Sequence, residues 1–435
     1  MARKKKTESC AFCGHSISEY PNMTLFSQEK SNGDTVYICD DCVQLLYDQL
    51  VSGEELIEET PEKKETKKKI PRPDEINKFL DDYVIGQDDA KKILSVAAYN
   101  HYKYLHYFDT HEDLKSKNPE TVELQKSNCL IVGDSGVGKT ESIRALAKFM
   151  DVPLAICDCS SLSSTGYVGA DPVSVLTELL YRADGDVSLA ERGIVFLDEF
   201  DKLAKSSSDN KAKDVTGEGV QMELLKIIEG TTVDVPVSPS KKMMSEAVRM
   251  DTRNILFICG GAFSGIIDII ADRADSESRK PTLGFGDTRK SFEKESYNET
   301  IMKVTTDDFI EYGIMQEMLG RLPVIVPFKQ LTKEELIKIL TEPKNAIVKQ
   351  YVELLKMDRA ELIFTPEALE RIAEEAISRN IGARGLRSIL ESVLKTAMYE
   401  LPKRKTPCTV TITDATVKDR TLPEIKNKVR VKTVG

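Results

Sequence analysis

Long apolar runs are missing from this 435-residue sequence, and no stretch approaches the roughly 18 residues that a membrane-spanning helix needs. The first residues, Met1 to Lys6, are basic but lead into polar residues, which is not the pattern of a secretory signal. A cysteine pair begins by residue 10, which argues against a transit peptide. These absences predict a chain that needs no membrane and stays in a reducing compartment, the cytoplasm.

Protease signatures are missing as well. The sequence contains no H-E-x-x-H or G-x-S-x-G motif, and no pairing of a nucleophile with a base, so it is not expected to cut peptide bonds itself. Internal repeats are absent. The net charge of −10 argues against a dedicated nucleic-acid-binding protein, because such proteins present basic surfaces to phosphates.

What is present is a complete phosphate loop, G-x-x-x-x-G-K-[ST], at residues 133–140. An apolar run, Cys129 to Val132, precedes it and a helix-like stretch follows, which is the strand–loop–helix setting that the motif requires. Backbone N–H groups of such a loop surround phosphate oxygens, Lys139 reaches the β- and γ-phosphates, and Thr140 binds Mg²⁺. The predicted ATP-binding residues here are Gly133, Asp134, Ser135, Gly136, Val137, Gly138, Lys139, Thr140 and Glu141.

A second segment that indicates a catalytic site reads Gly-Ile-Val-Phe-Leu-Asp-Glu-Phe-Asp-Lys over residues 193–202. Its apolar residues, Ile194 to Leu197, are typical of a strand buried on both faces of a parallel sheet, which presents ligands at its carboxyl end. We expect Asp198 to hold Mg²⁺ through its water shell. We expect Glu199, on the opposite side of the strand, to polarise the attacking water. With the phosphate loop, this segment predicts an ATPase.

Four of the nine cysteines follow the spacing C-x2-C-x25-C-x2-C. Two such pairs supply four thiolates to one tetrahedral Zn²⁺, and the alternative of disulfides is disfavoured in a reducing compartment. Four thiolates leave no open coordination position, so the module is expected to bind proteins rather than to catalyse. The predicted zinc ligands are Cys10, Cys13, Cys39 and Cys42. The remaining cysteines are expected to be buried thiols: Cys129, Cys157, Cys159, Cys259 and Cys408.

The composition changes along the chain divide it into five parts. Eleven of the sixteen residues at 54–69 are charged, and such a segment cannot bury apolar surface, so it reads as a flexible tether. Pro71 and Pro73 end the tether. The resulting domains are a zinc-binding domain (1–52), a linker (53–73), a large ATPase domain (74–326), a smaller, mainly helical lid domain (327–415) and a frayed tail (416–435).

The large domain alternates strand-like runs with helical periods, as a parallel α/β sheet requires. The expected strands are Asn128 to Val132, Pro153 to Cys157, Gly193 to Leu197 and Asn254 to Cys259. Two long polar stretches, Lys205 to Gly219 and Asp272 to Thr300, are expected to be mobile loops with a function. In the lid, Thr332 with Glu335 forms a capping box, Thr365 begins a second helix, and a short strand spans Thr409 to Thr413.

These features together resemble the ClpX family of AAA+ protein unfoldases over nearly the whole chain. The zinc module, tether, phosphate loop, D-E-x-D-K segment and helical lid occur in the family's order. The most specific shared strings begin at Asp82 (D-Y-V-I-G-Q), Gly166 (G-Y-V-G), Gly320 (G-R-L-P) and Gly382 (G-A-R-G-L-R). The implied fold is an α/β AAA+ P-loop ATPase with a helical lid and an N-terminal zinc domain.

The resemblance also implies roles for individual residues. Arg321 would be an arginine finger that reaches the γ-phosphate bound by a neighbouring subunit, and Arg384 a second sensor that contacts the nucleotide of its own chain. Val84 and Ile85 would pack against the adenine. The segment with Tyr167 and Val168 would line a hexamer's axial pore and grip the translocated polypeptide, and Leu283, Gly284 and Phe285 would dock into clefts of the ClpP peptidase.

Two positions depart from the family pattern. Lys241-Lys242-Met243 stands where the family has a basic R-K-H entrance loop, which leaves the preference for degradation tags open. Gly260 and Gly261 follow the fourth expected strand, where many AAA+ proteins place a polar first sensor, so we assign no residue to that role.

The leading prediction is an ATP-dependent unfoldase, a homohexamer that recognises tagged or unfolded proteins, directly or through adaptors, and threads them into a ClpP-type peptidase. Its cofactors would be ATP, Mg²⁺ and Zn²⁺, and dimerisation of the zinc domain is a further option. The alternative is a nucleic-acid-remodelling AAA+ ATPase with a zinc ribbon. The acidic balance argues against that alternative, as does an aromatic pore segment that lacks neighbouring Lys or Arg.

Overall fold

The structure, a computed structural model, describes residues 9–13, 15–16, 24–29, 35–44, 70–110, 122, 124–163, 170–205, 217–237, 247–278, 297–379, 381–404 and 406–427. The chain forms two compact units, Met1–Lys69 and Ile70–Gly435, which we describe separately. No helix in the described ranges is both long and apolar enough to cross a membrane.

The first unit is built around a short hairpin and four cysteines. Strands β1 (Leu25–Glu29) and β2 (Thr35–Cys39) pair antiparallel, with Leu25 opposite Cys39. Its buried cluster consists of Cys10, Cys39 and Cys42, against which only Leu25 and Ile38 pack among the described residues. Such a small apolar cluster does not stabilise a fold by itself, so we expect the thiols to hold this unit together.

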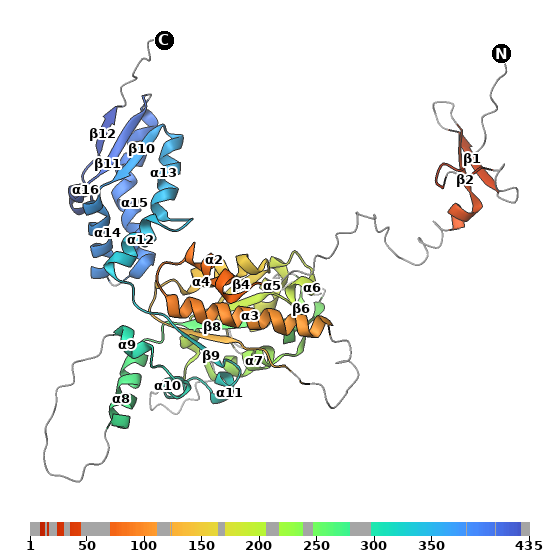
Figure 1. Cartoon of the computed structure of the whole chain (residues 1–435), viewed down its shortest axis with the longest axis horizontal. Coiled ribbons are helices and arrows are strands. Elements are labelled where there is room, and N and C mark those ends of the chain that lie inside the picture. The colour runs from red at the N-terminus through yellow and green to blue at the C-terminus, as the bar shows by residue number, and fades with distance from the viewer. Residues whose placement is uncertain are drawn as a thin grey trace, which may run out of the picture. The chain divides into compact units, whose positions relative to one another are not determined.

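The second unit is organised by a five-stranded parallel sheet, shown in Figure 1. The strand order is β4-β5-β8-β3-β9, and every neighbouring pair runs parallel. The strands are β3 (Cys129–Val132), β4 (Leu154–Asp158), β5 (Ile194–Asp198), β8 (Leu256–Gly261) and β9 (Val324–Pro327). The four strands expected from the sequence are present within two residues of their expected bounds, and β9 is an additional edge strand.

Helices cover both faces of this sheet and bury them in two apolar clusters. One face packs against α2, α3 and α4, and Phe196 and Ile131 lie in that cluster. The other face packs against α5, α7 and the helices after β8, with Leu197 and Phe257 among its members. The helices are α2 (Pro73–Asp81), α3 (Asp88–Thr110), α4 (Lys139–Met150), α5 (Ser174–Arg182), α6 (Val187–Ala190), α7 (Gly217–Glu229), α8 (Ile266–Ser278), α9 (Tyr297–Ile301), α10 (Thr306–Tyr312) and α11 (Gln316–Leu319).

Parts of the two expected loops are helical. Residues 217–219 open α7, and residues 272–278 continue α8. Helix α8 extends this far because Ile266 and Ile270 bury one of its faces, and because Arg273 pairs with the buried Asp308 at 2.8 Å. Between these regions, β6 (Thr232–Pro236) and β7 (Ala247–Asp251) form an antiparallel ribbon that lies outside the main sheet.

A smaller domain with its own apolar cluster follows β9. The capping box of Thr332 and Glu335 and the N-cap at Thr365 are confirmed as helix starts. Its elements are α12 (Lys333–Thr341), α13 (Ile347–Met357), β10 (Ala360–Phe364), α14 (Pro366–Ser378), α15 (Gly382–Glu400), β11 (Cys408–Ile412), α16 (Asp414–Asp419) and β12 (Glu424–Asn427).

This domain continues past residue 415, where the sequence analysis placed a frayed tail. Helix α16 buries Thr416 and Val417, and β12 pairs antiparallel with β11, so that β10, β11 and β12 form a three-stranded sheet. Strand β12 could not be predicted from the sequence, because it is short and polar and is held mainly by its pairing with β11.

Candidate active site and metal centre

The phosphate loop lies between β3 and α4, as its motif predicts. Gly136 and Gly138 have φ angles of 80° and 103°, a region that favours glycine, and the loop therefore turns sharply into the helix. A Cβ atom at Gly136 would lie 2.9 Å from the carbonyl oxygen of Ile381 in the small domain. The loop is thus closely approached from the other domain, while α4 directs its N-terminal N–H groups towards a bound anion.

Lys139 is buried at the start of α4. Its Nζ donates hydrogen bonds to the carbonyl oxygens of Gly133 and Asp134 at 2.5 and 2.8 Å. Burial lowers the pKa of Lys139 to about 8, although Asp198 opposes the shift. An anion beside this amine would favour its charged form, which suits a lysine that binds phosphate.

The two expected Mg²⁺ ligands lie in contact. The Thr140 hydroxyl donates to Asp198 Oδ2 at 3.2 Å, although the two residues are 58 positions apart. A hydroxyl and a carboxylate at the carboxyl end of a parallel strand are the oxygen donors that Mg²⁺ prefers. These two residues therefore fit a magnesium ion next to the phosphate loop.

Glu199 does not lie on the strand, and in this respect the sequence analysis was wrong. Strand β5 ends at Asp198, and Glu199 follows it with φ 55°, a left-handed conformation that is uncommon for a residue with a side chain. The short helix η3 (Phe200–Leu203) begins directly afterwards. This turn exposes the Glu199 carboxylate, because the backbone leaves the sheet before it reaches that residue.

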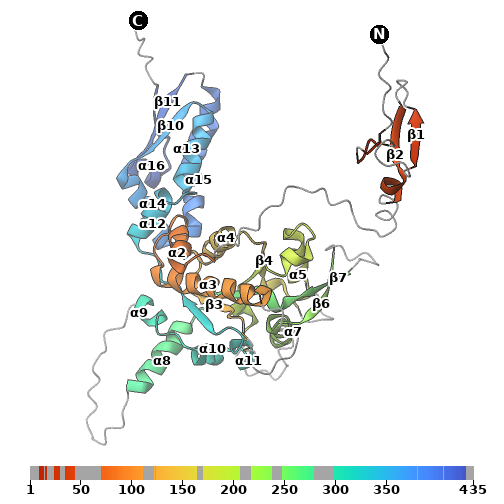
Figure 2. The same ribbon diagram turned by 45° about the vertical axis from the view of Figure 1, so that its right-hand side comes forward.

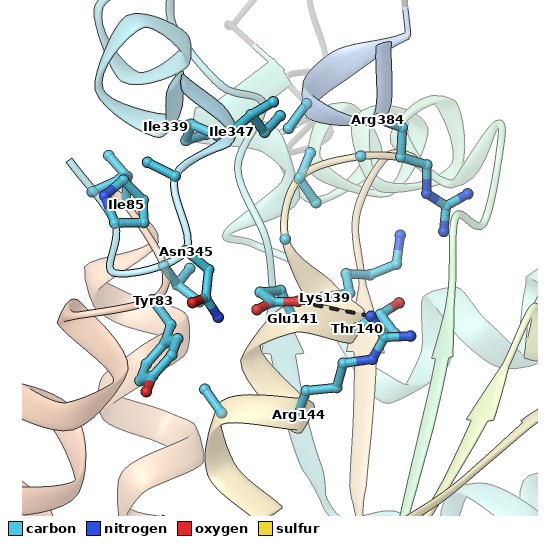
Figure 3. A pocket seen from close by; sticks show the side chains of 18 of the residues that line it. Tyr83, Ile85, Lys139, Thr140, Glu141, Arg144, Ile339, Asn345, Ile347 and Arg384 are labelled. Carbon is cyan, nitrogen blue, oxygen red and sulfur yellow. Dashed lines mark ion pairs between the residues drawn. The ribbon is translucent and has the colours of Figure 1, made fainter. Parts of the chain in front are cut away.

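A cavity of about 660 Å³ opens beside the phosphate loop and is lined by both domains. Figure 3 shows an apolar side with Ile85, Ile339 and Ile347, and a polar side with Lys139, Arg384 and other charged groups. This division suits a nucleotide, whose base is flat and weakly polar and whose phosphates are charged. Of the expected binding residues, the cavity is lined by Val84, Ile85, Gly136, Val137, Gly138, Lys139, Thr140, Glu141 and Arg384.

Direct contacts fix the small domain against the phosphate loop. Arg384 Nη1 donates to the Ser135 hydroxyl at 3.0 Å, and the Ala383 N–H donates to the Gly136 carbonyl at 3.1 Å. Asp134 accepts hydrogen bonds from the Tyr297 hydroxyl at 3.2 Å and from Gln330 Nε2 at 2.5 Å. The phosphate loop therefore forms hydrogen bonds with three segments that lie far from it in the sequence.

Several cavity residues were not identified from the sequence. Ile339 and Ile347 lie on α12 and α13, more than 190 residues after the phosphate loop, and their apolar spacing reads as ordinary helix packing. Tyr83, Arg144 and Asn345 also line the cavity. The only local signal was the position of Tyr83 directly before Val84, within the D-Y-V-I-G-Q string.

The four cysteines of the first unit form a compact cluster. The Sγ atoms of Cys10, Cys13, Cys39 and Cys42 all lie within 4.8 Å of one another. Bonds of about 2.3 Å to a tetrahedral Zn²⁺ would space the sulfurs by about 3.8 Å, and Cys13 and Cys39 are 3.7 Å apart. N–H groups of Phe12 and Cys39 point at Cys10 Sγ at 3.4 and 3.3 Å, as a thiolate prefers. The donor set and its spacing fit one structural zinc ion.

Comparisons with known proteins agree with this architecture. Residues 124–325 match the family model "AAA domain (Cdc48 subfamily)", and residues 331–412 match "C-terminal, D2-small domain, of ClpB protein". The chain is 42% identical over 410 residues to the protein of Borrelia duttonii (strain Ly) named "ATP-dependent Clp protease ATP-binding subunit ClpX", covering 93% of this chain and 90% of that protein. The corresponding protein of Borrelia recurrentis (strain A1) shows the same identity and coverage. The chain belongs to the ClpX family.

Membership of the ClpX family makes the chain an AAA+ ATPase of the unfoldase class, and the nucleic-acid-remodelling alternative is not favoured. The fold expected from the ClpX resemblance is confirmed: a parallel-sheet ATPase domain, a mainly helical small domain and an N-terminal four-cysteine unit.

Arg321, the finger expected from the ClpX resemblance, does not line the cavity of its own chain. Its Nε and Nη2 donate to Glu229 Oε1 at 3.0 and 2.9 Å, and both side chains are about half exposed. An exposed pair of this kind is weak, so a stronger anion could displace Glu229 from the guanidinium.

The remaining ClpX-like positions lie outside the described residues. These are the pore residues Tyr167 and Val168, the docking residues Leu283, Gly284 and Phe285, and the segment Lys241 to Met243. Gly260 and Gly261 belong to β8 itself rather than following it. A Cβ atom at Gly261 would lie 2.6 Å from Asp201 Oδ1, which explains why no larger residue stands there.

Proposed function

We propose that this chain binds ATP in the cavity between its two domains and hydrolyses it with the help of a second copy. The observation that carries the proposal is the joint lining of one cavity by the phosphate loop and the small domain. A ligand bound between two domains changes their relative position when its phosphates change, which turns hydrolysis into movement.

In this proposal each residue has a separate task. Lys139 and the loop N–H groups bind the β- and γ-phosphates, and Arg384 contacts the same nucleotide from the small domain. Thr140 and Asp198 would hold Mg²⁺, which neutralises phosphate charge when bound. Glu199 takes the proton of a water whose oxygen attacks the γ-phosphorus, as the bond to the β-phosphate oxygen breaks and ADP and phosphate form.

The site is completed, we propose, by Arg321 of a neighbouring copy. Its absence from its own cavity and its exposed pairing with Glu229 suit a side chain that acts on another subunit. Arginine fingers elsewhere accelerate hydrolysis by about 10³–10⁵-fold. A closed ring gives every site such a neighbour, so we propose the homohexamer expected of the family.

The work done by hydrolysis is, we propose, the unfolding of tagged or adaptor-delivered proteins and their translocation into a ClpP-type peptidase. Tyr167 would grip the polypeptide, and Leu283 to Phe285 would dock the peptidase. The relatives' printed name, a Clp protease subunit, supports this role. We place this activity in the cytoplasm.

The first unit is proposed to be a zinc-bound protein-recognition module. Phe12 and Phe26 are 62% and 52% exposed, and the described residues of this unit form only a small apolar cluster. Exposed aromatic side chains of this kind favour contacts with substrates, adaptors or a second zinc unit.

The deciding experiment combines the full chain, ATP, a ClpP-type peptidase and a folded fluorescent substrate carrying a degradation tag. Loss of fluorescence that requires ATP is the expected result. Tyr167→Ala should retain ATP hydrolysis but process the substrate poorly, whereas the matched Tyr181→Ala, which alters a 66% exposed tyrosine on α5, should behave like the parent. Undiminished unfolding by Tyr167→Ala would refute the pore assignment.

A further inference from the structure

Gln221 is a fully buried polar residue in the first half of α7, and both ends of its amide are used. Its Nε2 donates to the carbonyl oxygen of Leu203 at 2.6 Å, and its Oε1 accepts from the N–H of Met315 at 3.0 Å. Only one orientation of the amide can donate to this carbonyl and accept from this N–H at the same time, so the two partners fix how the side chain lies.

The two partners belong to segments with proposed catalytic residues. Leu203 ends η3, the short helix that begins directly after Glu199. Met315 is the N-cap of α11, which ends two residues before Arg321. Gln221 therefore joins the turn that carries the proposed base to the segment that carries the proposed finger.

The turn has a fixed attachment on its other side. Asp201 in η3 is 5% exposed, and its Oδ1 accepts a hydrogen bond from the N–H of Ala262 at 3.2 Å, just after β8. Asp201 therefore holds η3 to the end of β8, and Gln221 joins η3 to α11, so the Glu199 turn lies beside two separate attachments. The left-handed φ of Glu199 is a strained conformation that such surroundings must maintain.

Helix α7 also contacts Arg321 at its far end. Glu229, its last residue, accepts both hydrogen bonds from the Arg321 guanidinium. Gln221 and Glu229 are separated by about 12 Å along the helix, at 1.5 Å per residue. Figures 1 and 2 both place α11 beside α7. Helix α7 therefore contacts the segment from Met315 to Arg321 at both ends, through Gln221 and through Glu229.

We propose that Gln221 is a positioning residue for ATP hydrolysis, which couples the Glu199 turn of one site to the Arg321 segment that serves the neighbouring site. This inference rests on the proposed roles of Glu199 and Arg321. Gln221 is fully buried and both ends of its amide are occupied by protein partners, so we assign it no direct contact with a nucleotide.

Two substitutions test the proposal by removing hydrogen bonds of Gln221. Gln221→Met keeps the length of the side chain and removes both hydrogen bonds. Met315→Pro removes only the N–H donor, and the φ of −64° at Met315 already matches that of proline. Met315→Ala is the matched control for the loss of the methionine side chain, and Met222→Ala, at a 48% exposed position of α7, is the control for the helix.

Steady-state ATP hydrolysis by the full chain should show a kcat that falls by about 2- to 30-fold in Gln221→Met and Met315→Pro, the range usual for coupling residues. The KM for ATP should stay near that of the two controls, whereas the melting temperature should fall, because Gln221→Met leaves the Leu203 carbonyl and the Met315 N–H without their partner. In an Arg321→Ala background, measured under single-turnover conditions, Gln221→Met should cost a smaller factor, because residues that act together are not additive.

An unchanged kcat in both variants would overturn the inference, as would an equal factor in the parent and the Arg321→Ala background. If Gln221→Met does not fold, the comparison of Met315→Pro with Met315→Ala still decides the question. The proposed function fails separately: in that case Glu199→Gln or Arg321→Ala alone would retain parental turnover, whatever the effect of Gln221.

Discussion

The two units of this chain hold their folds in opposite ways. In the part of the first unit that the structure describes, three cysteines form a buried cluster with two partly buried apolar neighbours, and four thiols lie within 4.8 Å of one another. The second buries both faces of a five-stranded sheet and the interior of a small domain in three apolar clusters. We expect a bound metal to stabilise the first unit as apolar packing stabilises the second.

The difference also separates their functions. Four thiolates around a zinc ion would leave no position for a substrate, so we expect the first unit to present a surface rather than to perform chemistry at a metal. The second unit has a rigid sheet that ends in Asp198 and a separate small domain that reaches the phosphate loop. We therefore expect ATP hydrolysis and the proposed domain movement in the unit that is stabilised by apolar packing.

The largest expected effect comes from removing the metal. Cys39→Ser, or a strong chelator, should lower the zinc content from one ion per chain to none and unfold the first unit, because metal binding supplies its folding free energy. ATP hydrolysis and the main thermal transition should persist. Zinc analysis and calorimetry on the same sample would check this, with Cys408→Ser, a buried thiol outside the cluster, as the control that keeps zinc.

If zinc loss also abolished ATP binding, the two units would not be independent, and the comparison would be wrong.

A smaller loss of stability is expected when a core side chain of the small domain is truncated, which leaves an empty space in its apolar cluster. Leu394 on α15 is fully buried in the small-domain cluster, so Leu394→Ala should lower the free energy of unfolding by about 2–5 kcal/mol. The matched Leu354→Ala removes the same atoms from a 47% exposed position on α13 and should cost far less. Zinc content should stay the same in both. Equal losses of stability in chemical denaturation would show that the cluster is not what holds this domain.

The smallest expected effect is on the stability of the fold at low pH. His101 on α3 is buried, neither ring nitrogen has a hydrogen-bond partner among the described residues, and burial, with a contribution from Lys126, lowers its pKa to about 3. The unfolded chain binds this proton near pH 6.5, so between pH 6.5 and 3 it holds more protons than the folded chain. Stability is thus full above pH 6.5 and falls as the pH drops towards 3.

His101→Phe should remove that part of the acid sensitivity, about 3 kcal/mol between pH 6.5 and pH 4. His106→Phe, at an exposed position of the same helix, should leave the pH dependence as it is. Denaturation midpoints at pH 7 and pH 4 would be compared for the three proteins. A parent and a His101→Phe variant with the same pH slope would contradict the assignment.

Local patterns in the sequence predict the core of the site. The phosphate loop occupies eight consecutive residues, and the strand before Asp198 is a continuous apolar run, so both could be identified without tertiary information. The contact of Thr140 with Asp198 then follows, because parallel strands bring their carboxyl ends to one edge. The cysteine spacing likewise predicts the cluster that the structure contains.

Features that depend on distant parts of the chain could not be predicted. Ile339 and Ile347 look like packing residues, and only the fold brings them to the nucleotide cavity. The backbone turn at Glu199 has no sequence signal, since a glutamate rarely adopts a positive φ. Gln221 reads as one of several polar residues in an amphipathic helix, and its two partners are 18 and 94 residues away.

We propose that the second unit hydrolyses ATP through Glu199, which follows Asp198 next to, and not in, the lining of the cavity that its two domains share. Glu199→Gln tests it most directly, because the amide fills the same volume but cannot take a proton from water. We predict that ATP binding, measured by equilibrium titration, is retained, while turnover falls by about 10²–10⁴-fold. Parental turnover in Glu199→Gln, with ATP still bound, would contradict the account.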